Sequence, residues 1–416
     1  MEIFTVKPTD LSGEITAPPS KSFAHRILIC AYLSGRRVKI NNIGSSDDVL
    51  VTLNALKTMG ADVELNGDSV ILKKGKIPTD KVIIDCGESG SSLRFLMPIA
   101  CALGVNCEFV GKGKLLSRPI DKLKQALTLN GAIIDGFSVS GKLSKGKYII
   151  DGSISSQYIT GLLLALTAID GESEIEILGA PVSAPYIDIT LSVLTEFGAS
   201  VYRTDKGFIV KGGYNLTKEE FIVEGDWSGA SFFLSAGAIG GRVKVNGLNL
   251  NSVQGDRKIV EILKSFGAKI KEENNSVCVE KSKLSAIKID MDSVPDLCQI
   301  VSVVSAFASG NTEILGVERL KIKESDRIKA IIDMLSVSGI IAEYRDNEII
   351  IHGGEPTGGN FDGGKDHRTV MSSTVLATYS KGNSKITGAE FYTKSYPEFV
   401  RDYKDLGGEL NVDIQG

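Results

Sequence analysis

The 416-residue sequence has little histidine and cysteine, and neither residue type forms a metal-binding or redox motif. The three histidines, His25, His352 and His367, lack the HExxH spacing of a zinc enzyme, and none of the six cysteines belongs to a CxxC pair. The sequence also has no Walker-type loop and no Rossmann glycine fingerprint. We therefore expect buried, reduced thiols, no metal ion and no cofactor.

Long apolar runs and an excess of basic charge are also missing. No stretch approaches the roughly 18 apolar residues of a membrane span, and the amino terminus has no basic segment followed by an apolar one. Lys and Arg number 47 against 51 Asp and Glu, a balance of -4 that gives no sign of a nucleic-acid partner. With 42% hydrophobic residues, we expect a folded cytoplasmic protein with no membrane or nucleic-acid partner.

Glycine, in contrast, is abundant, and its 45 copies follow a repeat. One series of glycines ends a helical pattern at intervals of about 69 residues. Two further series run in step with it, one closing strand-like segments and one closing more apolar helices. The first series is Gly60, Gly131, Gly198, Gly267, Gly339 and Gly407. Six copies of one structural unit are therefore predicted.

Each copy has the pattern of a βαβαββ unit. The first helix, as in residues 161–168, is apolar or small on nearly all sides, which is typical of a buried helix. The second, as in 256–266, has one apolar stripe, and alternating strand-like runs follow the glycine. The last copy ends after one strand, so we infer that residues 2–7 complete it. If three copies form a domain, the chain crosses between domains near 15–20 and near 223–226.

Polar residues gather at the starts of the buried helices. These starts are rich in Gly, Ser and Asp, and a helix amino terminus is favourable for anions. Taken singly, Ser20, Ser89, Asp226 and Asp296 fit the pattern of ordinary helix caps. Capping does not account for the cations at the same places, because a cation near a helix start opposes the helix dipole. The cations are Lys21, Arg26, Arg94 and Arg368. A negatively charged group is expected beside them.

A second polar set follows the middle strands. It includes residues 112–119, 182–188, 252–256, 321–327 and 392–397. Lys323 and Arg327 are four residues apart and would share one face of a helix, with Glu324 turned about 100° away. Such a charge run by itself is usually a solvated helix face. Its recurrence at corresponding places in several copies favours a binding site made of cations, hydroxyls and a few carboxylates.

Seven motifs in these segments resemble the 5-enolpyruvylshikimate-3-phosphate synthase family, and the likeness covers essentially the whole chain. The motifs are Pro18–Ser22 with Arg26, Gly152–Gln157, Pro185–Thr190, Val223–Asp226, Lys323–Arg327, Asp366–Arg368 and Lys394–Pro397. The resemblance implies an α/β (α+β) fold, a two-domain inside-out α/β barrel. Its six βαβαββ repeats would be arranged three per domain about a pseudo-threefold axis.

The resemblance also implies domain bounds and a domain closure. The first domain would be residues 16–224, mainly on the shikimate 3-phosphate side. The second would combine 1–15 with 225–416, the N-terminal strand completing the sixth repeat. The two domains would close over ligands held in the cleft. We expect a monomer.

The implied reaction transfers the enolpyruvyl group of phosphoenolpyruvate to the 5-hydroxyl of shikimate 3-phosphate through a tetrahedral intermediate. Asp296, Glu324 and Lys21 would be catalytic. Residues implied to bind shikimate 3-phosphate are Lys21, Ser22, Arg26, Ser155, Ser156, Gln157, Ser183, Tyr186, Asp296 and Lys323. Residues implied to bind phosphoenolpyruvate are Lys21, Gly90, Arg118, Gln157, Arg327, Arg368 and Lys394.

The charges of these side chains fit two anionic substrates. Each substrate has a carboxylate and a phosphate, so the pair carries roughly -5 to -6 at neutral pH. The cations of the implied site are Lys21, Arg26, Arg118, Lys323, Arg327, Arg368 and Lys394. Seven positive charges would balance two such substrates and would be excessive for one. Arginine suits bidentate capture of carboxylate and phosphate, whereas lysine can also donate a proton.

Three positions depart from the family's usual pattern: Glu88, Phe95 and Arg319 stand where many relatives have Asn, Pro and Asn. Gly90 leaves room for glyphosate, the herbicide that competes for the phosphoenolpyruvate site in this family.

Two alternatives remain. One is the related enolpyruvyl transferase that acts on UDP-N-acetylglucosamine; its usual loop cysteine is replaced here by Gly113. The other is a non-catalytic repeat scaffold that binds polyanions such as RNA ends, which gives Asp296 and Glu324 no role.

Overall fold

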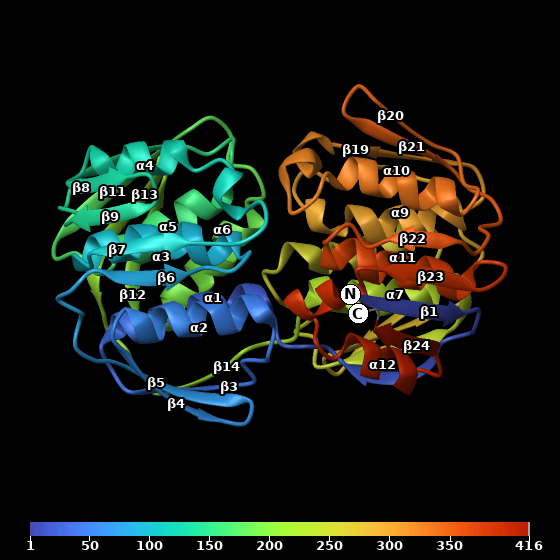
Figure 1. Ribbon diagram of the computed structural model, residues 1–416, viewed down its shortest axis with the longest axis horizontal. Helices are drawn as coiled ribbons and strands as arrows, with labels where there is room; N and C mark the ends of the chain where they lie inside the picture. The colour runs from blue at the N-terminus through green and yellow to red at the C-terminus, as the bar shows by residue number, and fades with distance from the viewer. Residues whose placement is uncertain (415–416) are drawn as a thin grey trace. The chain divides into compact units, whose positions relative to one another are not determined.

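The computed structural model describes residues 1–414 and divides the chain into two compact units (Figure 1). The contiguous unit is Lys21–Val223, and the split unit combines Met1–Ser20 with Glu224–Gly416. The chain thus enters the contiguous unit after Ser20 and leaves it after Val223. Residues 16–20 and Glu224 belong to the split unit, although the sequence analysis assigned them to the first domain.

Each unit contains three four-stranded sheets. Those of the contiguous unit have the orders β14-β3-β5-β4, β6-β7-β9-β8 and β10-β11-β13-β12. Those of the split unit are β16-β17-β15-β2, β18-β19-β21-β20 and β22-β23-β1-β24. In every sheet the first two strands of the repeat are parallel and the last two are antiparallel, as in the β6–β7 and β8–β9 pairs. The predicted inside-out α/β fold with six βαβαββ repeats is confirmed.

The elements of the contiguous unit follow one another in the predicted repeat order. They are α1 (Lys21–Ser34), β3 (Val38–Asn41), α2 (Asp47–Thr58), β4 (Ala61–Asn66), β5 (Ser69–Lys74), β6 (Val82–Asp85), α3 (Gly90–Leu103), β7 (Cys107–Val110), η1 (Leu115–Ser117), α4 (Asp121–Thr128), β8 (Ala132–Asp135), β9 (Ser138–Gly141), β10 (Lys147–Asp151), α5 (Ser156–Leu166), β11 (Glu172–Leu178), α6 (Pro185–Glu196), β12 (Ala199–Thr204), β13 (Gly207–Tyr214) and β14 (Glu220–Ile222).

The split unit begins with two amino-terminal strands and resumes after residue 223. Its elements are β1 (Glu2–Lys7), β2 (Ser12–Thr16), α7 (Trp227–Gly240), β15 (Arg242–Asn246), η2 (Gly255–Lys258), α8 (Ile259–Ser265), β16 (Lys269–Glu273), β17 (Ser276–Glu280), β18 (Lys288–Asp290), η3 (Pro295–Leu297), α9 (Cys298–Ala306), β19 (Asn311–Leu315), η4 (Glu318–Ile322), α10 (Arg327–Val337), β20 (Ala342–Arg345), β21 (Glu348–His352), β22 (Asn360–Asp362), α11 (His367–Tyr379), β23 (Ser384–Thr387), η5 (Ala389–Lys394), α12 (Phe399–Asp405) and β24 (Glu409–Ile414).

Two strands are exchanged where the chain passes between the units. Strand β2 comes just before α1 in the sequence, but it pairs in parallel with β15 of the split unit. Strand β14 comes just before α7, but it pairs in parallel with β3 of the contiguous unit. The chain therefore passes between the units just after the first strand of a repeat. The helix that continues the repeat of β2 is α7, and the helix that continues the repeat of β14 is α1, each some 200 residues away in sequence.

The amino-terminal strand lies inside the last sheet of the split unit. Strand β1 pairs antiparallel with both β23 and β24, with Glu2 opposite Ile414 and Phe4 opposite Ile386. Figure 1 shows this blue strand beside red ones. The sixth repeat thus takes its final strand from the start of the chain.

The first helix of each repeat is buried, as its composition predicts. All residues of α9 are buried, as are ten of the eleven residues of α5, where only Gln157 is partly exposed. In the split unit α7, α9 and α11 pack against one another, whereas in the contiguous unit α3 packs closely on α5. Each unit has its own hydrophobic core around these helices.

The glycines of the first series end the second helices in the left-handed backbone region. All six have positive φ, between 71° and 106°. At Gly60 a Cβ would also lie 2.2 Å from the carbonyl oxygen of Lys76, so a side chain would face both strain and a clash. The glycine that recurs in each repeat of the sequence therefore forms the turn that ends the second helix.

Candidate active site

The sequence-predicted residues of the contiguous unit lie at the starts of its helices. Lys21 and Ser22 open α1, Gly90 opens α3, and Ser156 and Gln157 open α5. Ser155 caps α5 by accepting a hydrogen bond from the Gln157 amide at 3.3 Å, and Ser89 caps α3 through the Ser92 amide. Backbone amides and helix dipoles at three such starts favour a bound anion.

Lys21 is held by an acidic side chain of the next helix. Its Nζ donates to Asp48 Oδ2 at 2.9 Å, and both side chains are largely buried. Asp48 belongs to the first turn of α2, where a carboxylate is favoured by the helix dipole. The ammonium group is therefore fixed in place by a charge-assisted hydrogen bond.

Arg26 is 2% exposed and bonds to neutral groups of the protein. Its Nε donates to Thr190 Oγ1 at 2.8 Å, Nη1 to the Ser22 carbonyl at 2.7 Å and Nη2 to the Tyr186 carbonyl at 3.0 Å. Burial lowers its pKa to about 10, which leaves it charged at neutral pH. Arg26 thus ties the start of α1 to α6, and its positive charge meets no carboxylate among these partners.

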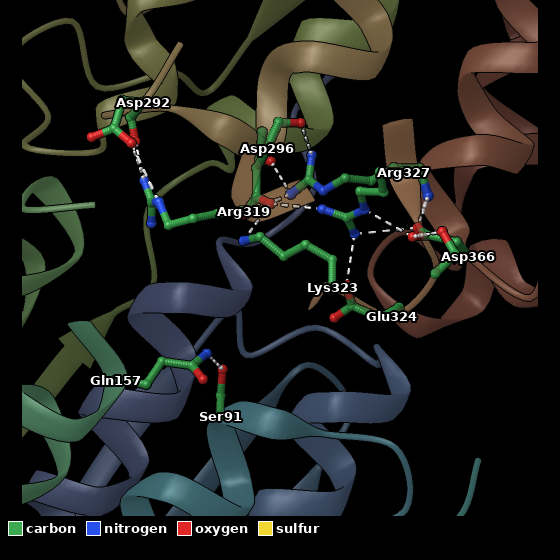
Figure 2. A network of polar contacts seen from close by, with 12 residues as sticks. Ser91, Gln157, Asp292, Asp296, Arg319, Lys323, Glu324, Arg327 and Asp366 are labelled. Carbon is green, nitrogen blue, oxygen red and sulfur yellow. Dashed lines mark hydrogen bonds and ion pairs between the residues drawn. The ribbon is translucent and has the colours of Figure 1, made fainter. Parts of the chain in front are cut away.

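Gln157 is oriented by two residues of the neighbouring helix. Arg94 Nη1 donates to Gln157 Oε1 at 2.6 Å, and Gln157 Nε2 donates to Ser91 Oγ at 3.0 Å, a contact drawn in Figure 2. The close approach depends on Gly161, which lies four residues after Gln157 on the same helix face. A Cβ at Gly161 would lie 2.3 Å from the Arg94 carbonyl oxygen. The small residue therefore lets α5 approach α3 and fixes which way the amide points.

Gly90 and Arg118 lie against each other. A Cβ at Gly90 would come within 2.6 Å of Arg118 Nη1 and 3.0 Å of Arg94 Nη1. The absence of a side chain at Gly90 thus lets the guanidinium groups of Arg118 and Arg94 approach the start of α3.

Ser183 and Tyr186 are close together at the start of α6. Ser183 is largely buried and has a φ of +50°, a conformation that residues other than glycine rarely adopt and that is enriched at functional sites. Its carbonyl accepts a hydrogen bond from the Tyr186 amide. Tyr186 in turn offers its own carbonyl to Arg26.

The residues predicted in the split unit gather around the carboxylate of Asp296 (Figure 2). Arg327 Nη1 donates to Asp296 Oδ1 at 2.9 Å and Lys323 Nζ to the same oxygen at 3.3 Å. Arg368 Nη2 lies 3.4 Å from Asp296 Oδ2, and its Nη1 donates to the Asp296 carbonyl. Asp296 is thus a largely buried carboxylate that faces three cations.

Arg327 connects Asp296 to two further carboxylates. Its Nη2 donates to Glu324 Oε2 at 2.8 Å, and its Nε to Asp366 Oδ2 at 2.8 Å. The Arg327 side chain is only 2% exposed. Burial raises the pKa of Asp366, but the charge of Arg327, the charge of His367 and the hydrogen bond from Arg327 together lower that pKa to about 2. Asp366 also caps α11 by accepting from the Arg368 amide.

The remaining split-unit residue of the predicted site is Lys394, the last residue of η5. It is 5% exposed and comes two residues after Tyr392, whose ring packs against that of Phe4. Its cation therefore lies in a mostly covered position at the end of a short helix.

The chain was compared with known protein families, curated proteins and solved structures. The family model of EPSP synthase (3-phosphoshikimate 1-carboxyvinyltransferase) matches residues 5–403. The 3-phosphoshikimate 1-carboxyvinyltransferase of Clostridium kluyveri is 38% identical, and that of Clostridioides difficile 35%. The match with the first covers 99% of each chain, and with the second 98% of each. An EPSP synthase structure from Acinetobacter baumannii has a TM-score of 0.85 and 25% identity over all of both chains.

The chain belongs to the EPSP synthase family. The resemblance inferred from the seven sequence motifs is therefore confirmed. Within the frame of an EPSP synthase fold, the predicted residues divide into two sets, one in each unit, and we call each set a cluster. The cluster of the contiguous unit comprises Lys21, Ser22, Arg26, Gly90, Arg118, Ser155, Ser156, Gln157, Ser183 and Tyr186. The cluster of the split unit comprises Asp296, Lys323, Glu324, Arg327, Arg368 and Lys394.

One local expectation was wrong. Lys323 and Arg327 do not share a helix face, because Lys323 follows η4 in extended conformation and α10 begins only at Arg327. Asp326 caps α10 by accepting a hydrogen bond from the Lys329 amide, so the helix does not extend back to Lys323. Lys323 and Arg327 nevertheless meet at the same Asp296 oxygen.

The capping alternative holds for two of the four residues considered. Ser89 and Asp226 cap α3 and α7, whereas Asp296 lies within η3 and caps no helix. Ser20 donates its hydroxyl to Gln254 Oε1 instead.

Two acidic residues that contact predicted site residues were given no role from the sequence. They are Asp48, at a helix start, and Asp366, which opens a quoted motif. Arg94, noted in the sequence only as a cation at a helix start, contacts Gln157. An acidic residue at a helix start could have been selected as the partner of a nearby cation. Arg319 binds Asp292, with Arg319 Nη2 3.0 Å from Asp292 Oδ1 (Figure 2).

Other features of the described chain bear on cofactors and location. Within residues 1–414 no three His, Cys, Asp or Glu side chains are grouped to hold a metal ion. The cysteines are free, and burial raises the pKa of Cys298, beside Asp296, to about 12. No helix in the described range is long and apolar enough to cross a membrane.

Proposed function

We propose that this protein transfers the enolpyruvyl group of phosphoenolpyruvate to the 5-hydroxyl of shikimate 3-phosphate and releases inorganic phosphate. Membership of the EPSP synthase family supports the reaction class. The observation that carries the proposal is the Asp296 carboxylate, which contacts Lys323, Arg327 and Arg368. A potential base among cations suits a substrate that brings a hydroxyl and negative charge together.

The proposed shikimate 3-phosphate contacts are hydroxyl, amide and cationic groups. They are Lys21, Ser22, Arg26, Ser155, Ser156, Gln157, Ser183, Tyr186, Asp296 and Lys323. In this proposal Arg26 acts mainly by holding Ser22 and Tyr186, because its own donors bond to Thr190, Ser22 and Tyr186.

The proposed phosphoenolpyruvate contacts are mostly cations. They are Lys21, Gly90, Arg118, Gln157, Arg327, Arg368 and Lys394. Arg327 would act on the substrate from behind its carboxylate partners, as its side chain is almost fully covered. Arg118, whose guanidinium lies against Gly90 at the start of α3, is better placed for direct bidentate contact with the substrate.

The proposed chemistry is an addition followed by an elimination. Asp296 removes the proton from the 5-hydroxyl of shikimate 3-phosphate while the hydroxyl oxygen attacks C2 of phosphoenolpyruvate. Glu324, together with Lys21, supplies a proton to C3. The C2–O bond to phosphate then breaks, and loss of a proton from C3 restores the double bond. Cations around the phosphate stabilise the charge that develops on the leaving group. No covalent enzyme intermediate is needed.

A phosphate-release assay tests the proposal. Purified protein with phosphoenolpyruvate and shikimate 3-phosphate is expected to release phosphate, and replacement of shikimate 3-phosphate by UDP-N-acetylglucosamine is expected to abolish release. The proposal is contradicted if phosphate is released with UDP-N-acetylglucosamine but not with shikimate 3-phosphate. It is also contradicted if no phosphate is released with either acceptor. The variant Arg203→Gln, which loses an exposed ion pair with Asp188 and a contact of the guanidinium with the Phe208 ring, serves as an active control.

We further propose that the protein is a cytoplasmic monomer whose domains hinge where the chain passes at residues 20–21 and 223–224. Sedimentation of the purified protein checks the monomeric state.

A further inference from the structure

Lys21 and His25 lie one turn apart on α1, and both contact α2. Lys21 pairs with Asp48, and His25 Nδ1 lies 2.7 Å from Thr52 Oγ1. Because Asp48 and Thr52 are also four residues apart, the two contacts follow one another along the helix pair. The second contact is the more deeply buried of the two. The proposed reaction gives His25 and Thr52 no role.

The contact between His25 and Thr52 continues to the start of α3. Thr52 Oγ1 lies 2.7 Å from Ser92 Oγ, and Ser92 Oγ donates to Ser89 Oγ at 2.8 Å. Ser89 is the residue that caps α3, and it also accepts from the Ser92 amide at 3.2 Å. All four side chains are buried. A continuous line of hydrogen bonds therefore joins α1, α2 and the cap of α3.

The direction of these hydrogen bonds follows from the number of hydrogens that each group carries. Ser92 gives its single hydroxyl hydrogen to Ser89, so toward Thr52 it can only accept. Thr52 then gives its own hydrogen to Ser92 and can only accept from His25. His25 therefore carries a hydrogen on Nδ1, whereas its buried Nε2 has no hydrogen-bond partner among the described residues.

The surroundings of His25 keep its ring neutral. The charged groups near it are the cations Lys21 and Arg26 and the carboxylate of Asp48. Burial lowers the pKa of His25 to about 3; Asp48 opposes this shift and the two cations add to it. The ring also packs edge to face with Phe95 of α3, with the ring centroids 6.3 Å apart. A neutral ring held in this way has one hydrogen to donate, and Thr52 receives it.

The start of α3 is where this line of hydrogen bonds reaches the proposed site. Gly90 directly follows the cap and adjoins the Arg118 guanidinium. Ser91 accepts the hydrogen bond from Gln157 Nε2 that orients this amide. A shift of the Ser89 cap would therefore move groups that are proposed to bind phosphoenolpyruvate.

We propose that His25 is a positioning residue that fixes the start of α3 relative to Lys21. It does so as the first donor in a one-way line of hydrogen bonds that ends at the cap of α3. The ring is buried, so it supports capture of phosphoenolpyruvate without touching either substrate. This inference rests on the function proposed above.

Substitutions test the hydrogen bond separately from the volume of the ring. The amide nitrogen of His25→Asn falls near the place of Nδ1, whereas that of His25→Gln falls near the place of Nε2. Thr52→Val keeps the shape of the threonine but interrupts the line. The matched control is Thr167→Val, because Thr167 is equally buried and its hydroxyl contacts Tyr214 and the Leu164 carbonyl at the other end of α5. Thermal unfolding confirms that each variant is folded before its kinetics are compared.

Phosphate release measures the kinetic effects. We expect His25→Gln and Thr52→Val each to raise KM for phosphoenolpyruvate about tenfold, the effect of roughly one lost hydrogen bond. KM for shikimate 3-phosphate should change less than about twofold, because most of its proposed contacts lie on other helices. His25→Asn should keep KM for phosphoenolpyruvate within about threefold of wild type, although the smaller side chain lowers the melting temperature. Thr167→Val should leave both KM values unchanged.

Nitrogen NMR of wild-type protein labelled at histidine tests the direction of the line without relying on a variant's kinetics. His25 is expected to show a protonated Nδ1 and a bare Nε2, with signals constant between about pH 5 and pH 8. These signals are assigned by their loss in the His25 variants. A hydrogen on Nε2 in place of Nδ1 overturns the proposal, because Thr52 would then have to donate to the ring.

Two kinetic results also overturn the proposal. One is an unchanged KM for phosphoenolpyruvate in Thr52→Val, and the other is an equal rise of this KM in His25→Asn and His25→Gln. A merely structural role for His25 predicts that both KM values change together and follow the loss of melting temperature. Failure of the proposed function is separate from these outcomes, because wild-type protein would then release no phosphate from the two substrates.

Discussion

The two clusters place their cations against different kinds of partner. In the contiguous unit Arg26 bonds to hydroxyl and carbonyl oxygens, and Arg94 to the Gln157 amide and the Pro119 carbonyl. In the split unit Arg327 bonds to three carboxylates, those of Asp296, Glu324 and Asp366. One cluster keeps an excess of positive charge, and the other is close to balanced within itself.

This difference suggests a division of labour. In the contiguous unit Lys21 pairs with Asp48, but Arg26 and Arg94 donate to neutral acceptors, and a bound anion would supply negative charge beside them. A balanced cluster gains less from an added charge, but its carboxylates are held where they can exchange protons. We therefore expect changes in the split unit to act mainly on the chemical step and on stability, and changes in the contiguous unit mainly on substrate affinity.

The largest effect is expected from Asp296→Asn. The amide can still accept hydrogen bonds from Lys323 and Arg327 but cannot take a proton, so kcat should fall about 1,000-fold. Asp48→Asn, the corresponding change beside Lys21, should reduce kcat only about tenfold, because Lys21 keeps a neutral acceptor. Steady-state phosphate release measures both. Equal losses in the two variants would contradict the proposed division.

The second comparison concerns the two buried arginines. Arg327→Gln leaves three carboxylates without their shared cation and should lower the free energy of unfolding by about 3–5 kcal/mol. Arg26→Gln leaves only neutral acceptors and should lower it by about 1–3 kcal/mol. Urea denaturation provides both values. A larger loss for Arg26→Gln would show that neutral partners matter more to stability than the carboxylates do.

The pH dependence of the free energy of unfolding also distinguishes the two arginine variants. Because Arg327 holds the folded-state pKa of Asp366 at about 2, below the usual 3.8, Asp366 stabilises the wild type above about pH 4. That stabilisation disappears as pH falls through about 2. In Arg327→Gln this stabilisation is absent. Protonation of the unpaired carboxylates at lower pH removes the unfavourable free energy of burying their charge. The stability gap between wild type and variant should therefore be widest near pH 7 and narrower near pH 5, whereas the gap for Arg26→Gln should not narrow.

The smallest effect is expected from Gly90→Ala in the contiguous unit. The new methyl group would displace the Arg118 guanidinium, whose Nη1 lies 2.6 Å from the Cβ position. Displacement is possible because the side chain is flexible, so we expect KM for phosphoenolpyruvate to rise about tenfold with little change in kcat or stability. Gly146→Ala, where the nearest atom is 3.4 Å away, is the matched control. A lower kcat at unchanged KM would place Gly90 with the chemical step instead.

The sequence was informative where a local pattern repeats or where a motif is distinctive. The glycine series predicted six repeats, because a helix end in the left-handed region leaves the same mark in each copy. The resemblance supplied residues such as Lys21 and Asp296. Long-range partners left no comparable mark: Arg327 pairs with both Asp296 and Asp366, which lie 31 and 39 residues away in sequence.

The helix face assigned to Lys323 and Arg327 failed for a related reason. Spacing alone assumed a helix throughout, and the cap at Asp326 begins the helix too late for Lys323 to belong to it. The partners of Arg26 could not be predicted either, since neutral backbone carbonyls are available everywhere along a chain.

The exchanged strands have a consequence for the order in which the chain can assemble. Strand β14 completes the contiguous unit as soon as residue 222 has been made, so this unit can fold early during synthesis. Strands β1 and β2 are made before the contiguous unit, but β2 pairs with β15 and β1 must await β23 and β24, some 380 residues later. Strand β1 is thus made early and paired late, and until then its backbone groups are open to pairing with another chain.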